Sequence, residues 1–350
     1  MLTEPRLNIL HVILSRGFAG SERSTAESCN QQCKHHNVTL IIKKNHRKNG
    51  ISIVDNLDPS VKVEIVPVRI LTQYFLNRLI RKSKANIIHA HLRRATRLIA
   101  KINPPAATVS TLHIGVNGPH FLQMDGLICN ARWQIEAITG DYAGQTFKAN
   151  NSVQSHRRLS GEEVFALRHS LGVEDHQLLI GAVGRYNASK AWDTLIKAFK
   201  QLDKPDLILL FFGSGSQEQE LKQLASGDQR IRFIGYRSDI KDLYQTFDLA
   251  ACPSRFEPLP RVMLEAMDAG IPVIASDTGG CKELIEDYGG YIFRTDDIDD
   301  LVRVLTSCTK RKLAAHKPDL SAHYVENANA AMEGFYRRLV ESKQNKTPSQ

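Results

Sequence analysis

The sequence has no apolar stretch approaching the roughly 20 residues needed to span a bilayer, and its first residues lack the charged-then-apolar pattern of a signal peptide. Its six cysteines form no C-x2-C pair, and several lie within apolar or helical patterns, so we expect buried free thiols and neither disulfides nor a cysteine-bound metal. No G-x-G-x-x-G run is present, which removes the dinucleotide-binding fingerprint. Together these absences predict a protein of the reducing cytoplasm.

Acidic residues are scarce in the first half of the chain. Residues 1–150 hold 20 Lys and Arg against 9 Asp and Glu, a net charge of +11, whereas residues 151–350 hold 26 against 28. A basic first half is expected to meet an anionic partner. Aromatic residues make up only 7% of the chain and do not interleave with the basic clusters, so stacking on nucleic-acid bases is not indicated.

Two basic segments in this half have helical spacing. Segment 69–84 reads as an amphipathic helix with a basic end, and Arg94, Arg97 and Lys101 fall on one face of the next predicted helix. Either segment could hold phosphate groups or contact an anionic membrane surface, at about 1 kcal/mol per basic residue near that surface. A helix with a solvated basic face is the competing interpretation of both.

Strand and helix patterns alternate along the chain, which is typical of an α/β fold. With 350 residues, 42% of them hydrophobic, the chain can bury two cores. A polar, aperiodic stretch near 150–160 predicts domains at 1–155 and 156–322, followed by an amphipathic helix at 323–341 and a disordered tail at 342–350. Strands are predicted at 7–14, 37–42, 63–67, 87–90, 108–113, 126–129, 178–183, 207–212, 231–234, 249–253 and 273–275.

Glu257 and Glu265 are the most informative pair of side chains. Two prolines precede an amphipathic helix that stops at Gly270, so we expect one carboxylate before the helix and the other about two turns into it. Eight helical positions span roughly 12 Å, about the distance from sugar to ribose in a nucleotide sugar, and a helix N-terminus between them would stabilise a diphosphate. On spacing alone, an ordinary surface helix remains the stronger interpretation.

The surroundings of the pair resemble the E-x7-E motif of retaining glycosyltransferases of the GT-B fold, specifically glycosyltransferase family 4. The agreement extends through Pro253-Ser254, Glu265-Ala266 and the segment 270–273. This resemblance implies two doubly wound Rossmann-like domains facing a crevice, with the last helix crossing back to the first domain. It also implies that the first domain binds the acceptor and the second a nucleotide-diphosphate sugar, with Glu257 holding the donor sugar and Glu265 the ribose.

A basic element after the predicted strand 178–183 fits the same family. Arg185 and Lys190 match the family's G-R-x4-K element, which implies that they neutralise the diphosphate leaving group. Ala191 stands where the family usually has glycine. The competing interpretation, two solvated loop cations, is weaker once the resemblance is taken into account.

Several small residues are expected to let the backbone approach the donor. Gly17 and Gly20 lie where the family has a Gly-Gly-x-x-E loop, although the adjacent glycine pair is missing. Gly235 resembles the strand-end glycine beside the nucleobase.

The main motif departs from the family at Pro260, where many relatives have glycine. Because Pro258 and Pro260 carry no N–H, Leu259 and Arg261 are the local backbone donors that remain for the phosphate and sugar. This departure indicates either a subgroup with altered donor geometry or a weakened enzyme.

Three histidines follow or end strands in the first half. His113 occupies the place of a family histidine that lies over the sugar near the reacting carbon, so we assign it a functional role by resemblance. His89 and His91 are interpreted as structural.

The resemblance implies a retaining reaction that needs no metal and no cofactor. No residue identifies itself as the general base that an inverting enzyme requires, and the leaving phosphate would assist removal of the acceptor's proton. Asp297-Ile-Asp299 matches the D-x-D metal motif of a different glycosyltransferase fold, but acids before a helix suit its dipole, so we assign no metal there.

We therefore expect a cytoplasmic hexosyltransferase that contacts the inner face of the membrane peripherally. Its acceptor is expected to be an anionic, lipid-linked glycan such as lipopolysaccharide core or another surface glycan. One alternative is a sugar-nucleotide epimerase of the GT-B fold, which would need paired acid and base groups at the sugar. The other is a degenerate, non-catalytic anion-binding relative, which would fail to bind the donor.

Overall fold

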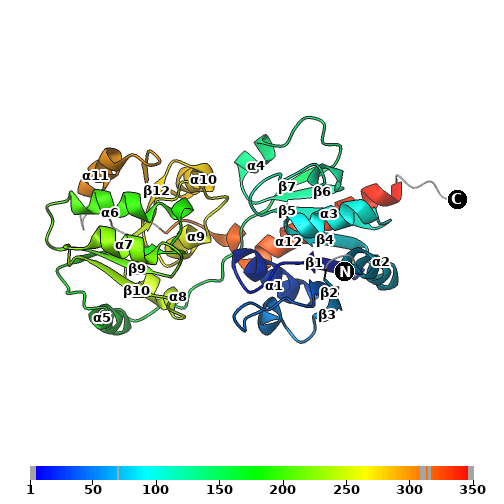
Figure 1. Ribbon diagram of the computed structural model, residues 1–350, viewed down its shortest axis with the longest axis horizontal. Helices are drawn as coiled ribbons and strands as arrows, with labels where there is room; N and C mark the ends of the chain where they lie inside the picture. Colours follow the sequence, from blue (N-terminus) through cyan, green and yellow to red (C-terminus); the bar gives the residue numbers. More distant parts are fainter. Residues whose placement is uncertain (1–4, 69–70, 308–312, 314–316, 346–350) are drawn as a thin grey trace. The chain divides into compact units, whose positions relative to one another are not determined.

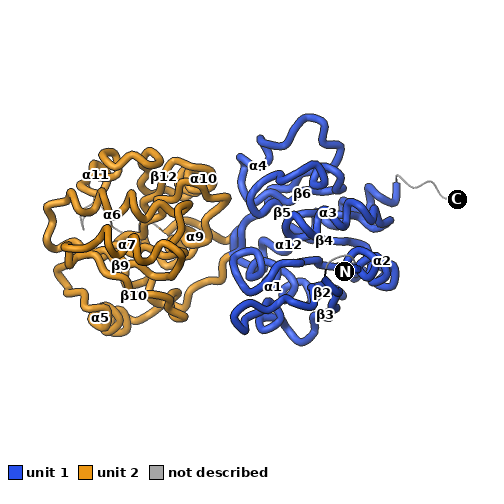
Figure 2. Tube along the Cα trace, in the orientation of Figure 1, with its two compact units in different colours: residues 1–152, 322–350 blue, residues 153–321 orange. Residues whose placement is uncertain are grey.

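The computed structural model describes residues 5–68, 71–307, 313 and 317–345. The chain forms two compact units, one of residues 1–152 and 322–350 and the other of residues 153–321 (Figure 2). Arg69, Cys308 and residues 346–350, on which sequence predictions fall, lie outside the described residues.

The first unit is built on a seven-stranded parallel sheet with the order β3-β2-β1-β4-β5-β6-β7 (Figure 1). Its strands are β1 (Asn8–Ile13), β2 (Asn37–Lys43), β3 (Lys62–Val66), β4 (Ile87–His91), β5 (Ala107–Leu112), β6 (Gly126–Cys129) and β7 (Gln145–Lys148). Its helices are α1 (Gly20–Gln32), α2 (Leu71–Ser83), α3 (Leu92–Ile102), α4 (Arg132–Glu136) and α12 (Val325–Asn345).

The second unit repeats this architecture with a six-stranded parallel sheet in the order β10-β9-β8-β11-β12-β13. Its strands are β8 (Leu178–Val183), β9 (Leu207–Phe212), β10 (Ile231–Gly235), β11 (Leu249–Cys252), β12 (Val273–Ser276) and β13 (Tyr291–Phe293). Its helices are α5 (Gly161–Ser170), α6 (Trp192–Lys200), α7 (Glu218–Ala225), α8 (Ile240–Tyr244), α9 (Arg261–Asp268), α10 (Gly279–Tyr288) and α11 (Ile298–Ser307).

Strand β2 shows how the core of the first unit divides into two layers. Ile41 packs in the layer that α2 and α3 cover, whereas Leu40 and Ile42 pack in the layer of α1 and α12. Successive side chains of a strand point to opposite faces of the sheet. Lys43, two residues after Ile41, therefore faces the side of α2 and α3.

The last helix, α12, belongs to the first unit, as the family resemblance implies (Figure 1). Phe335, Tyr336 and Leu339 pack in its core. The prediction that the tail begins at residue 342 is wrong, because α12 continues to Asn345. Lys343 pairs with Asp125 at 2.8 Å, a contact that favours helix over disorder at these polar residues.

Every strand predicted from the sequence is present, and the two Rossmann-like domains expected of a GT-B fold are confirmed. The sequence interpretation missed β7 and β13, the short strands at one edge of each sheet. Cys29, Cys129, Cys252 and Cys281 are buried free thiols, whereas Cys33 is half-buried. None of the helices in the described residues is long and apolar enough to cross a membrane.

Candidate active site

The carboxyl ends of the second sheet collect most of the donor-site residues predicted from the sequence. Arg185 and Lys190 follow β8, Glu257 follows the neighbouring β11, and Gly235 ends β10. Ligands of doubly wound sheets bind at this end of the strands. The fold of the second unit thus brings the predicted cations and carboxylates to one edge.

Lys190 and Glu257 form the central ion pair of this edge. The ammonium Nζ lies 2.5 Å from Oε2 of Glu257, and the two side chains are 17% and 16% exposed. Burial by itself lowers the pKa of Lys190, but Glu257 outweighs burial and leaves that pKa above its usual value. The Ser254 hydroxyl donates to the same carboxylate oxygen at 3.4 Å. The site therefore presents a permanent cation beside an oriented carboxylate.

Arg255, which the sequence interpretation missed, anchors the loop that carries Glu257. Its guanidinium donates two hydrogen bonds to Asp193 in α6, at 3.0 and 2.9 Å, and a third to Asp296 at 2.8 Å. These carboxylates raise the pKa of Arg255 further above its already high value. Bidentate pairs of this kind restrict orientation. Arg255 is therefore a positioning residue for the loop.

Gly280, also missed, closes the other side of the same loop. Its backbone N–H donates to the Glu257 carbonyl at 3.0 Å. A Cβ at this position would lie 2.1 Å from the Pro258 carbonyl oxygen, so only glycine allows helix α10 to approach so closely. The Gly279-Gly280 pair at the start of α10 was the available sequence signal.

Glu265 lies nearer the start of its helix than the sequence analysis predicted. Helix α9 begins at Arg261, with Pro260 in extended conformation at the N-cap, so Glu265 is about one turn into it and the expectation of two turns is wrong. Pro258 and Pro260 keep the preceding residues out of the helix. Glu265 is only 6% exposed and accepts a hydrogen bond from the Tyr244 hydroxyl at 3.2 Å.

The remaining donor-side predictions differ in exposure. Arg185 is exposed, and its guanidinium makes no hydrogen bond or ion pair with any residue in the described part of the chain. Leu259 is buried, and Arg261 is the first residue of α9. Gly235 has a positive φ of 86°, and a Cβ added to it would meet no atom within 4 Å, so its surroundings are open.

Some backbone groups of the predicted glycine loop in the first unit already hydrogen-bond to other residues of the protein. The Gly17 N–H donates to the His46 carbonyl at 2.8 Å, and Gly17 has a positive φ of 83°. Gly20 is exposed at the start of α1, and a Cβ added there would meet no atom within 4 Å. Between them, the Ala19 N–H donates to Glu22 at 3.0 Å. Of the two predicted glycines, Gly20 is the one whose surroundings leave room for a ligand.

His113 follows β5 directly and lines a cavity of about 280 Å³ together with His91, Arg93 and Arg94. Burial lowers the pKa of His113 to about 4, with a smaller opposing effect from Glu22. The imidazole is therefore neutral at pH 7. A neutral histidine at a strand end is suited to hydrogen bonding with a sugar hydroxyl.

Three other histidines, one in β1 and two in β4, form a buried network. His89 hydrogen-bonds the Tyr336 hydroxyl and the Thr111 hydroxyl, both at 2.7 Å. His11 lies 2.9 Å from His91 Nε2 through Nδ1 and 2.8 Å from Gln32 through Nε2. Ring nitrogens of His11, His89 and His91 lie within 4.8 Å of one another, but these hydrogen bonds account for the arrangement without an ion. The structural interpretation of His89 fits both of its contacts.

The basic residues predicted on one helical face lie on α3. Arg94 donates to the Thr72 hydroxyl at 3.4 Å, whereas Arg97 and Lys101 are exposed. The sequence contains no Asp or Glu from residue 65 to residue 124. This face of the first unit therefore carries uncompensated positive charge.

The acidic D-x-D segment begins a helix, as expected. Asp297 accepts a hydrogen bond from the Asp300 N–H at 2.9 Å and pairs with Arg294 at 2.8 Å, and α11 begins at the next residue. Both contacts are those of a helix start.

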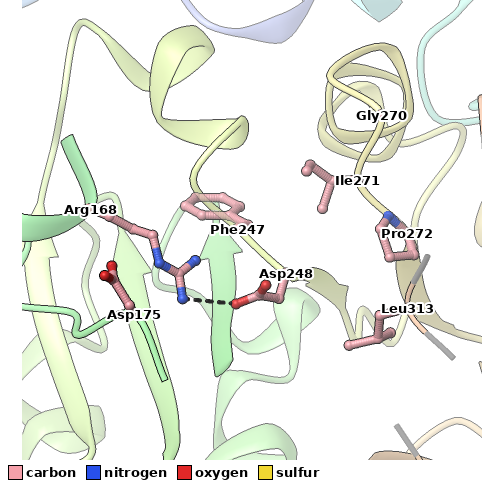
Figure 3. A pocket seen from close by; sticks show the side chains of 8 residues that line it. All are labelled: Arg168, Asp175, Phe247, Asp248, Gly270, Ile271, Pro272 and Leu313. Carbon is pink, nitrogen blue, oxygen red and sulfur yellow. Dashed lines mark hydrogen bonds and ion pairs between the residues drawn. The ribbon is translucent and has the colours of Figure 1, made fainter. Parts of the chain in front are cut away.

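A separate cavity of about 480 Å³ lies at the opposite end of the second sheet (Figure 3). Its lining includes Asp248 and Pro272, which precede β11 and β12, and Arg168, which pairs with Asp248 at 3.0 Å. None of the predicted site residues lines it. The amino ends of parallel strands are not where such sheets bind ligands, so the candidate site stays at the carboxyl ends.

Comparison with known proteins agrees with this placement. Residues 164–330 match the family model of glycosyl transferases group 1. A GDP-mannose-dependent phosphatidylinositol monomannoside mannosyltransferase of Corynebacterium glutamicum is 35% identical over 157 residues, 41% of each chain. The UDP-Gal:alpha-D-GlcNAc-diphosphoundecaprenol alpha-1,3-galactosyltransferase of Escherichia coli is 23% identical over 89% of this chain and 90% of its own.

Among solved structures, Anabaena HepE in complex with UDP and glucose superposes with a TM-score of 0.74 at 20% identity, covering 97% of this chain and 99% of HepE.

The alignments with the first curated relatives span only 34% to 46% of those proteins. The matched segment contains Arg185, Lys190, Glu257 and Glu265, the residues that carry the sequence resemblance. Residues 164–330 therefore form a glycosyl transferases group 1 domain, and the two Rossmann-like units have the fold of GT-B glycosyltransferases.

Proposed function

We propose that the chain is a retaining hexosyltransferase that moves a sugar from a nucleotide-diphosphate sugar to an anionic, lipid-linked glycan. The observation that carries this proposal is the Lys190–Glu257 pair at the carboxyl ends of the second sheet, with Glu265 buried in the adjacent helix. Charge stabilisation at a departing diphosphate is the main catalytic requirement of this reaction. The pair supplies a cation for the diphosphate and a carboxylate for the sugar hydroxyls.

In this mechanism the bond between the anomeric carbon and the donor phosphate breaks, and the nucleoside diphosphate leaves with both electrons. Lys190 and Arg185 stabilise the developing negative charge, and Glu257 holds the sugar hydroxyls. The acceptor hydroxyl attacks the anomeric carbon from the face of departure, and its proton passes to the leaving phosphate oxygen. Glu265 accepts hydrogen bonds from the ribose, and the two cations at the diphosphate take the role that a metal ion would otherwise have.

Two relatives support a lipid-linked acceptor. The Escherichia coli enzyme is named for a diphosphoundecaprenol-linked sugar and the Corynebacterium enzyme for a phosphatidylinositol mannoside. A lipopolysaccharide core mannosyltransferase of Rhizobium meliloti is a further relative, 30% identical over 148 residues. We propose that the present chain also acts at a membrane surface on lipopolysaccharide core or another surface glycan, from the cytoplasmic side.

Helix α2 supports peripheral contact with that surface. Leu71 and Tyr74 are 55% and 64% exposed, and the last turn carries Arg81 and Lys82. Exposed apolar side chains beside basic ones favour the interface of an anionic bilayer. Sedimentation with vesicles of anionic and of neutral lipids tests this contact, and equal binding to both would contradict it.

Calorimetric titration with UDP, GDP, ADP and CMP in EDTA tests the donor site. We expect one nucleoside diphosphate to bind without metal, and Glu265→Gln to weaken that binding at least tenfold because the ribose loses a charged acceptor. Tyr244→Phe is the matched control with a smaller expected loss, since it removes a hydrogen bond from Glu265 and keeps the carboxylate. If none of the four nucleotides bound, the alternative of a non-catalytic relative would be favoured. In that alternative, Pro258 and Pro260 prevent the loop from binding the donor.

A further inference from the structure

Lys43 is a lysine with a largely buried side chain and no counter-ion among the described residues. The residue is only 9% exposed at the end of β2, and no hydrogen bond or ion pair joins its ammonium to any residue that the structure describes. An ammonium that is partly withdrawn from water and placed near other cations is stabilised by an anionic ligand. Such a residue is retained most readily where a ligand supplies the missing charge.

Two arginines accompany Lys43 at the carboxyl ends of adjacent strands. Arg16 follows β1, Lys43 ends β2, and Arg94 is in the first turn of α3, directly after β4. The sheet order places β2, β1 and β4 side by side. The three cations therefore lie along one edge, where doubly wound sheets bind their ligands.

The contacts of Arg94 bring it over Lys43. Arg94 donates to Thr72 in α2, and α2 follows β3, on the far side of β2 and β1 from β4. Helix α2 also packs on β1, so its contact with Arg94 places the guanidinium on the face of the sheet that α2 and α3 cover. Lys43 faces this same side of the sheet, in line with Ile41. In agreement, burial first, then Arg94 and Arg16, lower the pKa of Lys43.

None of these three cations pairs with an acid among the described residues, although Glu22 lies at the same edge and hydrogen-bonds Ser15. Arg16 donates only to the Arg47 carbonyl, at 3.4 Å, and Arg94 only to a hydroxyl. Helices α2 and α3 contain no Asp or Glu, and α3 has no side-chain cap at its N-terminus. The helix dipole adds positive potential at the residues beside Arg94. The cavity lined by Ser15, Arg94 and His113 lies next to this cluster.

We propose that Lys43, Arg16 and Arg94 bind a phosphate group of the acceptor, a phosphomonoester or a diphosphate, while the adjoining cavity holds the sugar that receives the transfer. Two guanidiniums and an ammonium match the charge and the several acceptor oxygens of a phosphate better than those of one carboxylate. This assignment rests on the proposed function and adds to it the chemical class of the acceptor's anionic group.

Calorimetry with inorganic pyrophosphate tests the assignment on the full chain at constant ionic strength. Before the titration, the protein is saturated with the nucleoside diphosphate that binds the second unit, so that the donor site is filled. We expect one pyrophosphate to bind, Lys43→Met to weaken it at least tenfold, and Lys43→Arg to retain it within a few fold. Lys62→Met is the matched control, because Lys62 is at the amino end of β3 and pairs with Glu64.

Thermal unfolding gives a second readout that does not depend on the donor site. Without pyrophosphate, Lys43→Met is expected to melt at a higher temperature than the wild type, because it removes a positive charge that Arg94 and Arg16 repel. With pyrophosphate only the wild type gains stability, by mass action on the folded state. Unchanged pyrophosphate binding in Lys43→Met, or pyrophosphate that binds only by displacing the nucleotide, would overturn the proposal.

The same experiment separates the two proposals and the two sources of phosphate. If the wild type bound none of the nucleotides but still bound pyrophosphate at Lys43, this site would stand and the proposed transferase function would fail. If inorganic phosphate bound as tightly as pyrophosphate and glycerol phosphate do, the site would be one for the free ion. That result would contradict an acceptor-bound phosphate group. Weaker binding of the free ion supports an esterified phosphate.

Discussion

The two units of the chain share one architecture and differ in the charges at the carboxyl ends of their sheets. Each has a parallel sheet in which the chain runs outward over three strands, returns to the centre and runs outward again. At this edge of the second unit, cations are matched with carboxylates, as in Lys190–Glu257 and Arg255–Asp193. At the same edge of the first unit, neutral histidines stand beside cations that pair with no acid among the described residues.

Under the proposed function, this difference suits the two edges to two kinds of ligand. The paired edge can hold a carboxylate rigidly against sugar hydroxyls, and its lysine stays protonated. The cations of the unpaired edge repel one another, and an incoming anion would relieve that repulsion. Sequence similarity to the family model is confined to the unit with the paired edge and the start of α12, which is consistent with a common donor chemistry and a more variable acceptor.

Mild acid should separate the two units most clearly. Burial lowers the pKa of His11 to about 4 and puts those of His89 and His91 well below their usual value, whereas an unfolded histidine titrates near 6.5. The unfolded chain therefore binds more protons, so the stability of the first unit is intact above pH 6.5 and falls as the pH approaches 4. The loss is on the order of 3 kcal/mol for His11 alone.

Each unit contains one tryptophan, Trp133 in the first and Trp192 in the second. Urea unfolding followed by fluorescence in Trp192→Phe and in Trp133→Phe therefore reports the two units separately. Between pH 7 and 4.5 we expect the midpoint of the first unit to fall well below that of the second. A parallel decline of both midpoints would contradict the histidine explanation.

Replacing the cation of the paired edge should reduce transfer strongly. Lys190→Met leaves the departing diphosphate with less charge stabilisation, and we expect kcat to fall by at least a hundredfold, about 2.7 kcal/mol. Steady-state kinetics with the donor identified by calorimetry measures this. Lys197→Met is the matched control, because Lys197 reaches Asp193 only at 3.8 Å on the surface of α6. A loss of less than threefold in Lys190→Met would remove this lysine from the mechanism.

The paired edge also depends on a backbone contact. Gly280→Ala would place a Cβ 2.1 Å from the Pro258 carbonyl, so the loop that holds Glu257 must shift. Overpacking of this kind costs about 2 kcal/mol, and we expect both the melting temperature of the second unit and kcat to fall. Gly161→Ala is the control, since a Cβ added at Gly161 would meet nothing within 4 Å. Equal behaviour of the two variants would show that the contact is dispensable.

The sequence predicted every strand except one edge strand of each sheet. Central strands such as 207–212 are continuous apolar runs, because helices cover both of their faces. β7 and β13 have only four and three residues, most of them partly exposed, so no run marks them. Short length combined with exposure is the physical reason that this signal was missing, because the longer edge strands β3 and β10 and the equally short but buried β6 were predicted.

The candidate site divides in a similar way. Glu257, Glu265, Arg185 and Lys190 were found because a motif carries them, and the fold does bring together the ends of β8 and β11, which precede them. Arg255 and Gly280 act through contacts with residues at least 20 positions away, which spacing does not reveal. Lys43 is visible only once its burial and its lack of a partner among the described residues are known, since lysine at the end of a strand is otherwise ordinary.

The smallest expected effect tests whether the histidine network of the first unit is structural. Tyr336→Phe leaves His89 Nδ1 without its partner at 2.7 Å, and a lost buried hydrogen bond of this kind costs about 1 kcal/mol. We expect the first unit to lose this stability in the Trp192→Phe background, with nucleotide binding unchanged. The mirrored change in the second unit, Tyr244→Phe, should instead shift nucleotide affinity modestly, because Tyr244 contacts Glu265. If Tyr336→Phe altered nucleotide affinity as well, the network would be part of the donor site, and the assignment of histidines to structure and carboxylates to chemistry would fail.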